Sequence, residues 1–433
     1  MEMNRRQFLR AVGGAGLAVS GFGAASGCAP ALSKTDPSTG LSSTTVAGDV
    51  RHESALIWLR AEPKSEVVLQ YGSDPSFRQF SLAGPTSVTP EADHTAKILL
   101  EKLRPGTRYY YRARVTGKKN PGKIGSFVTA PQPDREASVS FCFSGDTRES
   151  YKPFTVMDAV RAQRPDFFMH LGDTIYADRG GTARTLEQFW RKYRSNRDDH
   201  ATQACFGSTS VYVVWDDHEV EDNYLPDHPL APVGRKAFLD YWPIRCPSSE
   251  TERIFRSFRW GKSLEVFILD GRQYRDLSKP TMLGRTQKEW LFDTVAQSDA
   301  LFKFIATTIP MVGGGRDRWD GFPEEREEIL RYLRAKKIPG VVFLSADLHY
   351  AAITKIPRGH GLLDITAGPL AAPLNRITNG TARRFKYFLA ENFNFAKITV
   401  DPKNDSDHAL LEFIDQDNQI FHRDKIRAEF WRA

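Results

Sequence analysis

Side chains that bind cations follow four apolar stretches of this sequence, at the points where predicted strands end. Each stretch has the near-continuous apolar character of a strand buried on both faces of a sheet. The polar residues that follow supply carboxylate, amide, phenol and imidazole atoms. In chain order they are Asp146 after residues 139–144; Asp173 and Tyr176 after 166–171; Asp216, His218 and Asn223 after 210–215; and Asp347 and His349 after 341–345.

Four such strand ends predict one shared metal site. In an open α/β sheet, ligands gather at the carboxyl ends of the strands. One Gly-Asp pair after a strand is more often a turn or a helix cap than a ligand, but a cluster of carboxylates is destabilised by mutual repulsion unless cations neutralise it. The carboxylates and the amide suit Ca²⁺, Mg²⁺ or Mn²⁺, and a phenolate from Tyr176 favours Fe³⁺. The few imidazoles do not favour a zinc-only site.

An α/β domain is predicted to position these ligands, because strands and amphipathic helices alternate after residue 138. Such a pattern indicates a sheet covered on both faces. The chain then returns to strands near its end, and a layered α/β/β/α arrangement accommodates both halves. The predicted strands are 139–144, 166–171, 210–215, 264–269, 302–308, 341–345, 362–366, 396–401, 409–415 and 418–422, and the predicted helices are 153–163, 185–194, 286–297 and 324–336.

A second, smaller domain is predicted at residues 44–131, which fits the expectation of two domains for 433 residues. Short strands follow one another here without helices, as in a small immunoglobulin-like or fibronectin-like sandwich. Residues 103–111 resemble the Leu-x-Pro-x-Thr-x-Tyr-x-Tyr segment of fibronectin-like sandwiches, and we expect their tyrosines to serve packing. Residues 131–133 (Pro-Gln-Pro) are the natural boundary to the α/β domain at 138–433, and residues 28–43 are predicted to form a flexible tether.

The first 27 residues resemble a twin-arginine export signal. Arg5 and Arg6 precede Phe8-Leu9 and a weakly apolar run rich in Gly and Ala. The resemblance implies passage through the twin-arginine export machinery after folding, often with a cofactor in place. Residues 25–28 also resemble a lipoprotein cleavage box, with Cys28 as the acylated residue. We therefore expect a periplasmic or cell-surface protein, with membrane attachment through a lipidated Cys28 as one alternative.

The composition indicates which classes of substrate and partner the protein is expected to bind. The formal charge is +7, and it is +5 without residues 1–27, which contain three arginines and one glutamate. A modest positive charge suits anionic substrates, but no basic block with interleaved aromatics predicts an obligate nucleic-acid partner. No internal stretch reaches the roughly 18 apolar residues of a membrane span. Cys142 is expected in the core, and Cys205 and Cys246 have a spacing that neither requires nor excludes a disulfide.

In order along the chain, these motifs resemble the alkaline phosphatase D (PhoD-like) family of metallophosphoesterases. The matching segments are Gly-Asp at 145–146, Gly-Asp-x-x-Tyr at 172–176, Trp-Asp-Asp-His-Glu-Val at 215–220 with the later Asn223, and Asp-x-His at 347–349. Residues 269–275 and 319–323 resemble its auxiliary motifs. The resemblance covers essentially the whole chain. It implies hydrolysis of phosphate monoesters and diesters at an Fe³⁺ and Ca²⁺ centre, with Mn²⁺ or Mg²⁺ as substitutes for these metals.

The resemblance also implies roles for individual ligands. Asp173 and Tyr176 would lie on the iron side, with Asp173 as a bridge, and Asp146 stands where better-known members have a cysteine ligand. A carboxylate there still binds ferric iron and is similar to the aspartate of purple acid phosphatases, which leaves the metal mixture open. The remaining ligands would be Asp216, Asn223, Asp347 and His349.

The implied mechanism has two or more metals that clamp a phosphate oxygen and generate a hydroxide for in-line attack on phosphorus. Arg148 could stabilise charge on the equatorial oxygens or pair with a surface acid. His218 could protonate the leaving alkoxide or orient a ligand. Asp217 and Glu219 are expected to support the ligands rather than bind metal, and His170 is expected to be a core histidine.

Three other functions remain open from the sequence. A phosphodiesterase or phospholipase acting on teichoic acid, lipid headgroups or nucleic acid would share the same metal chemistry, and a purple-acid-type phosphatase is a closer variant. A surface binding protein with a metal-stabilised but inactive second domain belongs to another class. The complete set of metal ligands argues against such a non-catalytic binding protein. Loops at 179–185, 227–235 and 313–319 are long enough to shape the mouth of the site and so to select the substrate.

Overall fold

The computed structural model describes residues 35–313, 315–376 and 382–428. The predicted export signal and Cys28 lie outside these ranges. Within them, no helix has both the length and the apolar character needed to cross a membrane. The three described cysteines, Cys142, Cys205 and Cys246, are free thiols.

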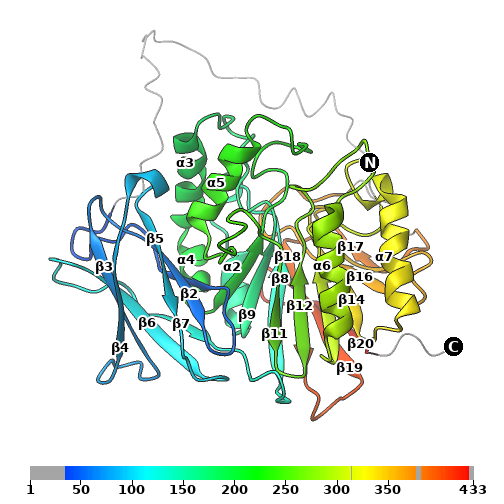
Figure 1. The fold of residues 1–433 in the computed structure, drawn as a ribbon, viewed down its shortest axis with the longest axis horizontal. Coiled ribbons are helices and arrows are strands. Elements are labelled where there is room, and N and C mark those ends of the chain that lie inside the picture. The colour runs from blue at the N-terminus through cyan, green and yellow to red at the C-terminus, as the bar shows by residue number, and fades with distance from the viewer. Residues whose placement is uncertain (1–34, 314, 377–381, 429–433) are drawn as a thin grey trace, which may run out of the picture. The chain divides into compact units, whose positions relative to one another are not determined.

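A nine-stranded sheet carries three of the four predicted site strands at its centre (Figure 1). The parallel neighbours β8 (Val139–Ser144), β9 (Phe167–Leu171) and β10 (Ser210–Val214) agree with the predicted strands to within one residue. Every residue of β9 and β10 is buried, as expected for parallel strands covered on both faces. Antiparallel strands β18 (Asn394–Val400), β19 (His408–Asp415) and β20 (Ile420–Arg427) extend the sheet beyond β8.

A seven-stranded sheet carries the fourth site strand, β14 (Val341–Ser345). Its core is parallel, with β12 (Leu264–Ile268), β13 (Phe302–Ala306), β14 and β16 (Leu363–Thr366) side by side. The remaining strands pair antiparallel at the two sides: β11 (Arg256–Trp260), β15 (Ala351–Lys355) and β17 (Phe385–Leu389).

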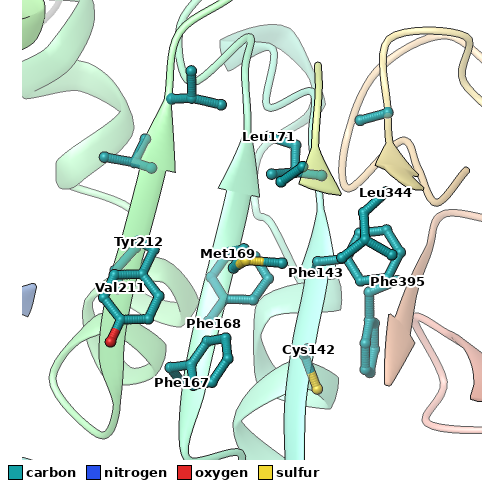
Figure 2. Packing of buried hydrophobic residues seen from close by; sticks show 14 of the residues in the cluster. Cys142, Phe143, Phe167, Phe168, Met169, Leu171, Val211, Tyr212, Leu344 and Phe395 are labelled. Carbon is teal, nitrogen blue, oxygen red and sulfur yellow. The ribbon is translucent and has the colours of Figure 1, made fainter. Parts of the chain in front are cut away.

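The two large sheets pack face to face, and helices cover their outer faces. Between the sheets, the ring of Phe141 lies 5.1 Å from that of Phe304, and the ring of Phe167 lies 4.8 Å from that of Trp260. Figure 2 shows part of this core around Phe143, Met169 and Leu344. Buried residues of four helices join the same core, and two further helices pack on the seven-stranded sheet. The four helices of the core between the sheets are α2 (Val156–Ala162), α3 (Leu186–Arg197), α4 (His200–Phe206) and α5 (Ala231–Tyr241). The two helices on the seven-stranded sheet are α6 (Gly284–Gln297) and α7 (Pro323–Ala335).

This arrangement confirms the predicted α/β/β/α architecture. Two helices were not predicted. Helix α4 has only seven residues, too few for a clear periodic pattern, and the side chain of Asp199 caps it by accepting from the Thr202 amide at 2.9 Å. Helix α5 occupies the second half of the segment predicted as the loop 227–235.

The predicted β-sandwich is present, but one of its sheets continues the large sheet. A separate four-stranded sheet contains β3 (Glu66–Gly72), β4 (Ser81–Ser87), β6 (Arg108–Val115) and β7 (Gly125–Val128). Opposite it lie β1 (Val46–Gly48), β2 (Ala55–Arg60) and β5 (Thr95–Leu100), and β1 pairs with β10 at Gly48 and Val211. A Cβ at Gly48 would lie 2.4 Å from Pro243 Cγ and 2.7 Å from the Val211 carbonyl, so only glycine allows this junction.

The described part of the predicted tether is packed. Leu41 is buried in the core of the sandwich and pairs with Ala61, and the Ser42 amide donates to the Arg60 carbonyl at 3.0 Å. The sandwich therefore includes residues before 44, its predicted start.

Candidate metal centre

The structure brings six of the predicted ligand and catalytic residues into one acidic centre. Potential ligand atoms form three groups, and within each group all atoms lie within 4.8 Å of one another. Asp173 and Asp217 each belong to two groups, so the three are continuous. The groups are Asp146, Asp173 and His349; Asp173, Asp217 and His218; and Asp216, Asp217 and Asp347.

The first group has the donor set of a metal site. Asp146 is 1% exposed, and neither of its carboxylate oxygens has a hydrogen-bond partner. Nε2 of His349 lies 3.3 Å from Asp146 Oδ1 and 3.2 Å from the Tyr176 hydroxyl. Because Nδ1 of His349 donates to the Pro373 carbonyl at 2.5 Å, the lone pair of Nε2 points into the group. Buried acceptors without donors fit a bound cation.

Burial and mutual repulsion perturb the acids of the centre. Burial raises the pKa of Asp173 well above its ordinary value, and the charges of Asp217 and Asp146 raise it further. Burial and Asp173 likewise raise the pKa of the Tyr176 phenol. Burial raises the pKa of Asp216 to about 7, although the nearby Arg272 opposes this. These carboxylates therefore need added positive charge to be ionised together, and a multivalent cation would supply it.

The backbone at the ligands is left-handed. The φ angles are 70° at Asp146, 53° at Asp173, and 56° at both Asp347 and His349. Non-glycine residues rarely adopt this region, which costs on the order of 1 to 3 kcal/mol and concentrates at functional sites. Strands β8, β9 and β14 thus turn sharply where they end. The turn before Asp173 also requires Gly172 (φ 91°), because a Cβ there would lie 2.6 Å from the Cβ of Asp216.

Glu219 holds two of the strand ends together. Its buried carboxylate accepts four hydrogen bonds: from the Asp173 amide at 3.1 Å, the Asp216 amide at 2.8 Å, the Thr174 amide at 2.5 Å and the Thr174 hydroxyl at 2.6 Å. It bridges the ends of β9 and β10, as its predicted supporting role requires.

Asp217 and Asn223 lie differently from the sequence-based expectation. Asp217, expected to support the ligands, belongs to two of the three groups. Asn223, expected to be a ligand, is exposed, and its side-chain amide donates to Asp222 at 3.2 Å. Its backbone amide donates to Asp217 Oδ2 at 2.8 Å. The structure therefore connects Asn223 to the centre through its backbone.

Two arginines that the sequence did not single out contact the acids. Arg272 is fully buried, with Nε 2.5 Å from Asp216 Oδ1 and Nη2 3.6 Å from Asp217 Oδ2. Arg318 pairs with Asp347 at 2.8 Å. Arg272 lies within the auxiliary motif at 269–275, and Arg318 directly precedes the one at 319–323. These motifs were the only feature of the sequence that could have indicated the two arginines. Asp270 links the first motif to the end of β10 by accepting from Trp215 Nε1 at 2.9 Å.

The two predicted catalytic side chains both lie next to Tyr176. The His218 ring stacks on Tyr176 with centroids 4.2 Å apart, and its Nδ1 donates to Asp178 at 2.8 Å. Burial disfavours the imidazolium, but the hydrogen bond to Asp178 and the charge of Asp217 outweigh it and raise the pKa of His218 to about 9. The Arg148 guanidinium carbon lies 5.9 Å from the Tyr176 ring, and Arg148 has no ion pair in the described part of the chain.

His170 is a core histidine, as predicted. It is buried in β9, and its Nε2 lies 3.2 Å from the Thr147 hydroxyl. Burial, together with the charge of Arg197, lowers the pKa of His170 to about 3. It therefore remains neutral at any physiological pH.

Comparisons with known proteins show which family the chain matches. The family model described as PhoD-like phosphatase matches residues 141–392, and that of the PhoD-like phosphatase N-terminal domain matches residues 27–131. Alkaline phosphatase D of Bacillus subtilis (strain 168) is 26% identical over 372 residues, which cover 70% of this chain and 63% of that protein. A phosphoenolpyruvate phosphatase of Allium cepa is 32% identical over 120 residues, 27% of this chain and 24% of that protein. The chain thus spans less than two thirds of the length of either relative.

Two solved structures share the fold. The structure of PhoD superposes with a TM-score of 0.78 at 20% identity, over 92% of this chain and 90% of that one. A purple acid phosphatase from yellow lupin (Lupinus luteus) seeds superposes with a TM-score of 0.68 at 14% identity, over 90% of this chain and 75% of that one. At these low identities the superpositions establish the fold alone. The reaction has to be inferred from the residues of the centre.

Proposed function

We propose that this chain, which belongs to the PhoD-like phosphatase family, is a metal-dependent phosphoric ester hydrolase. One observation carries the proposal. Asp146 is a buried carboxylate with two unpartnered oxygens, and it shares a ligand group with Asp173 and His349. When bound, cations at this centre would polarise a phosphate oxygen and activate a water for attack on phosphorus.

The donor types suggest which ions the centre holds. Asp146, Asp173 and His349, with the Tyr176 phenol beside them, suit Fe³⁺. The all-carboxylate group of Asp216, Asp217 and Asp347 suits Ca²⁺, with Mn²⁺ or Mg²⁺ as substitutes. Asp173 and Asp217 would connect the two sides, because the middle group of Asp173, Asp217 and His218 shares one residue with each.

The remaining side chains would act on the substrate. The guanidinium of Arg148 could bind equatorial phosphate oxygens, because it lies beside Tyr176 with a buried Nε that has no partner. The imidazolium of His218, held by Asp178, carries a proton that could pass to the leaving alkoxide. Arg318 would fix the orientation of Asp347.

A purple-acid-type phosphatase is the second candidate, and the carboxylate at Asp146 favours it. The yellow lupin structure named above is that of a purple acid phosphatase with the same fold. Tyrosinate-to-iron charge transfer would colour such a protein. A visible absorption band that disappears in Tyr176→Phe would support the iron assignment, and a colourless protein that contains calcium alone would contradict it.

The experiment that tests the hydrolase proposal combines elemental analysis with an activity panel. The full-length protein is assayed on chromogenic phosphate monoesters and diesters, with and without chelator, beside Asp146→Asn and the control Asp49→Asn. Asp49 is also buried but pairs with Arg256 outside the centre. We expect Asp146→Asn alone to lose metal and activity. Unchanged metal content and turnover in Asp146→Asn would contradict the proposal.

We further propose export by the twin-arginine route to the periplasm or cell surface. Arg5 and Arg6, followed by Phe8-Leu9 and the Gly- and Ala-rich run, support it. Replacement of both arginines by lysine should leave the protein inside the cell, and Cys28→Ala should release a membrane-attached form if Cys28 is lipidated. Fractionation of cells expressing each variant measures both effects, and normal export of the double-lysine variant would refute the route.

A further inference from the structure

A small internal cavity lies beneath the loops that carry Asp146 and Asp173. Its volume is about 20 Å³, and it is bordered by Thr147 and Thr174, the residues that follow those two ligands. The residues that line it are buried. About 10 to 15 Å³ is enough for one water molecule, so the cavity has room for a single water or a single monatomic ion.

Six buried polar atoms of the residues that line this cavity have no hydrogen-bond partner. They are Arg197 Nη1, Trp242 Nε1, Thr202 Oγ1, Asn196 Oδ1, His170 Nδ1 and Tyr193 Oη. The first two can only donate, and the threonine hydroxyl can turn its hydrogen inward. Asn196 Oδ1 is the one obligate acceptor, and its assignment is fixed because Nδ2 donates to the carbonyls of Thr147 at 2.8 Å and Thr174 at 2.9 Å.

Arg197 brings an uncompensated positive charge to the cavity. It is 4% exposed, and no carboxylate in the described part of the chain lies within ion-pair distance of it. Its guanidinium carbon lies 4.0 Å from the Trp242 ring and 5.1 Å from the Phe206 ring, and Nη2 donates to the Tyr241 carbonyl at 2.8 Å. Burial lowers the pKa of Arg197 to about 9. An isolated buried charge is strongly destabilising unless a counter-charge accompanies it.

We propose that this cavity binds one small monovalent anion, with chloride as its ligand under physiological conditions. Arg197 and Trp242 donate to it directly, and the Thr202 hydroxyl completes a set of three donors. The anion supplies the charge that the protein itself does not place beside Arg197. The site is separate from the metal centre, and it does not depend on the proposed hydrolase activity.

Occupancy of the site supports the loops that hold two metal ligands. Asn196 forms part of the wall and ties the loop after β8 to the loop after β9 through its two donated hydrogen bonds. His170 lines the same cavity and contacts the Thr147 hydroxyl. The anion therefore stabilises the fold around Asp146 and Asp173 as a structural ligand and takes no part in the reaction.

Thermal unfolding of the full-length, metal-loaded protein tests the proposal. Unfolding is measured in sodium chloride, sodium bromide and sodium gluconate at equal ionic strength. Because a ligand that binds only the folded state stabilises it, chloride and bromide should raise Tm by roughly 3 °C with saturation, and gluconate should not. Crystals grown in bromide should show one anomalous peak in this cavity, next to Arg197 Nη1. Equal Tm values in all three salts, with a water at this position in the crystal, would overturn the proposal.

Two variants test whether the chloride-specific rise in Tm comes from this cavity. Thr202→Val preserves shape and removes one donor, and Arg197→Met removes the charge. Both should lose most of the chloride-specific rise in Tm. Thr209→Val is the matched control, since Thr209 is an equally buried threonine that donates to the Pro165 carbonyl outside the cavity, and it should keep the full rise. A chloride effect of undiminished size in Thr202→Val would place the anion elsewhere and refute the assignment.

Discussion

Replacing Glu219 by glutamine tests whether the metal centre depends on a residue that binds no metal. Glu219 is fully buried, and each of its carboxylate oxygens accepts two hydrogen bonds. Oε1 accepts from the amide and hydroxyl of Thr174, and Oε2 accepts from the amides of Asp173 and Asp216. Glutamine has the same shape but replaces one acceptor oxygen by an NH₂ group.

The cost of this change follows from the four hydrogen bonds. With the glutamine oxygen in the Oε2 position, Asp173 and Asp216 keep an acceptor, and the Thr174 hydroxyl can turn to accept from the new NH₂ group. The Thr174 amide then faces another donor and stays unsatisfied, which costs about 1 to 3 kcal/mol. The three remaining bonds lose the strength that a charged acceptor gives. We therefore expect a loss of about 3 to 5 kcal/mol in the free energy of unfolding.

Metal binding should weaken together with stability, because Glu219 fixes the amides of two ligand-bearing residues. Loss of such supporting contacts typically lowers metal affinity 10- to 100-fold. The assay is chemical denaturation combined with metal titration of the chelator-treated protein. Glu325→Gln is the matched control, since Glu325 is also buried and accepts from Thr281, Met282 and Leu283 away from the centre.

The control separates general destabilisation from an effect on the centre. Glu325→Gln should lose a comparable amount of stability and keep the metal affinity of the parent protein. If Glu219→Gln retained that affinity as well, or if both variants lost it equally, the reasoning that Glu219 positions the ligands would be wrong.

Three further predictions concern single residues. Arg148→Ala should lower turnover of a chromogenic phosphate ester by about 10²-fold without loss of metal, as measured by kinetics and elemental analysis; full turnover would exclude the role. His170 has a pKa of about 3 in the folded protein, against an ordinary value of 6.5 for histidine, so the unfolded chain binds more protons below pH 6.5. Stability should therefore fall by up to about 1.4 kcal/mol per pH unit as the pH drops below 6.5 toward 3, and His170→Leu should flatten this part of the denaturation profile. Asp217→Asn should reduce bound metal, because Asp217 belongs to two ligand groups, whereas Asp222→Asn, at an exposed position, should not.

The sequence predicted the site strands because their apolar runs end abruptly in polar residues. β8 and β14 have the predicted bounds, and β9 and β10 differ from them by one residue at one end. The three-residue β1 was not predicted, since so short a segment has no periodic pattern. Its pairing with β10 makes the sandwich and the large sheet continuous, and such long-range pairing leaves no local signal.

The sequence predicted which acidic and histidine residues cluster in the centre better than it predicted which residues form ion pairs with them. Asp146, Asp173 and His349 come together as expected. Arg272 and Arg318 did not stand out, because an arginine far along the chain gives no sign of its ion-pair partner. For a related reason, the sequence did not show that Asp217 would lie within the ligand groups or that Asn223 would contact the centre through its backbone amide. In the tight turn after β10, the backbone decides which side chain faces inward, and the residue spacing does not.

Two residues that are not predicted ligands stabilise the loops that carry the ligands. Asp146, Asp173, Asp347 and His349 combine left-handed backbone with mutual repulsion of their acids, and both effects destabilise the unliganded centre. The compensating hydrogen bonds come from Glu219, which joins the ends of β9 and β10, and from Asn196, which joins the loops after β8 and β9. A chain with every ligand but without these two residues would have to order its loops by metal binding itself. The metal affinity would then fall by the free energy of that ordering, even though no ligand had changed.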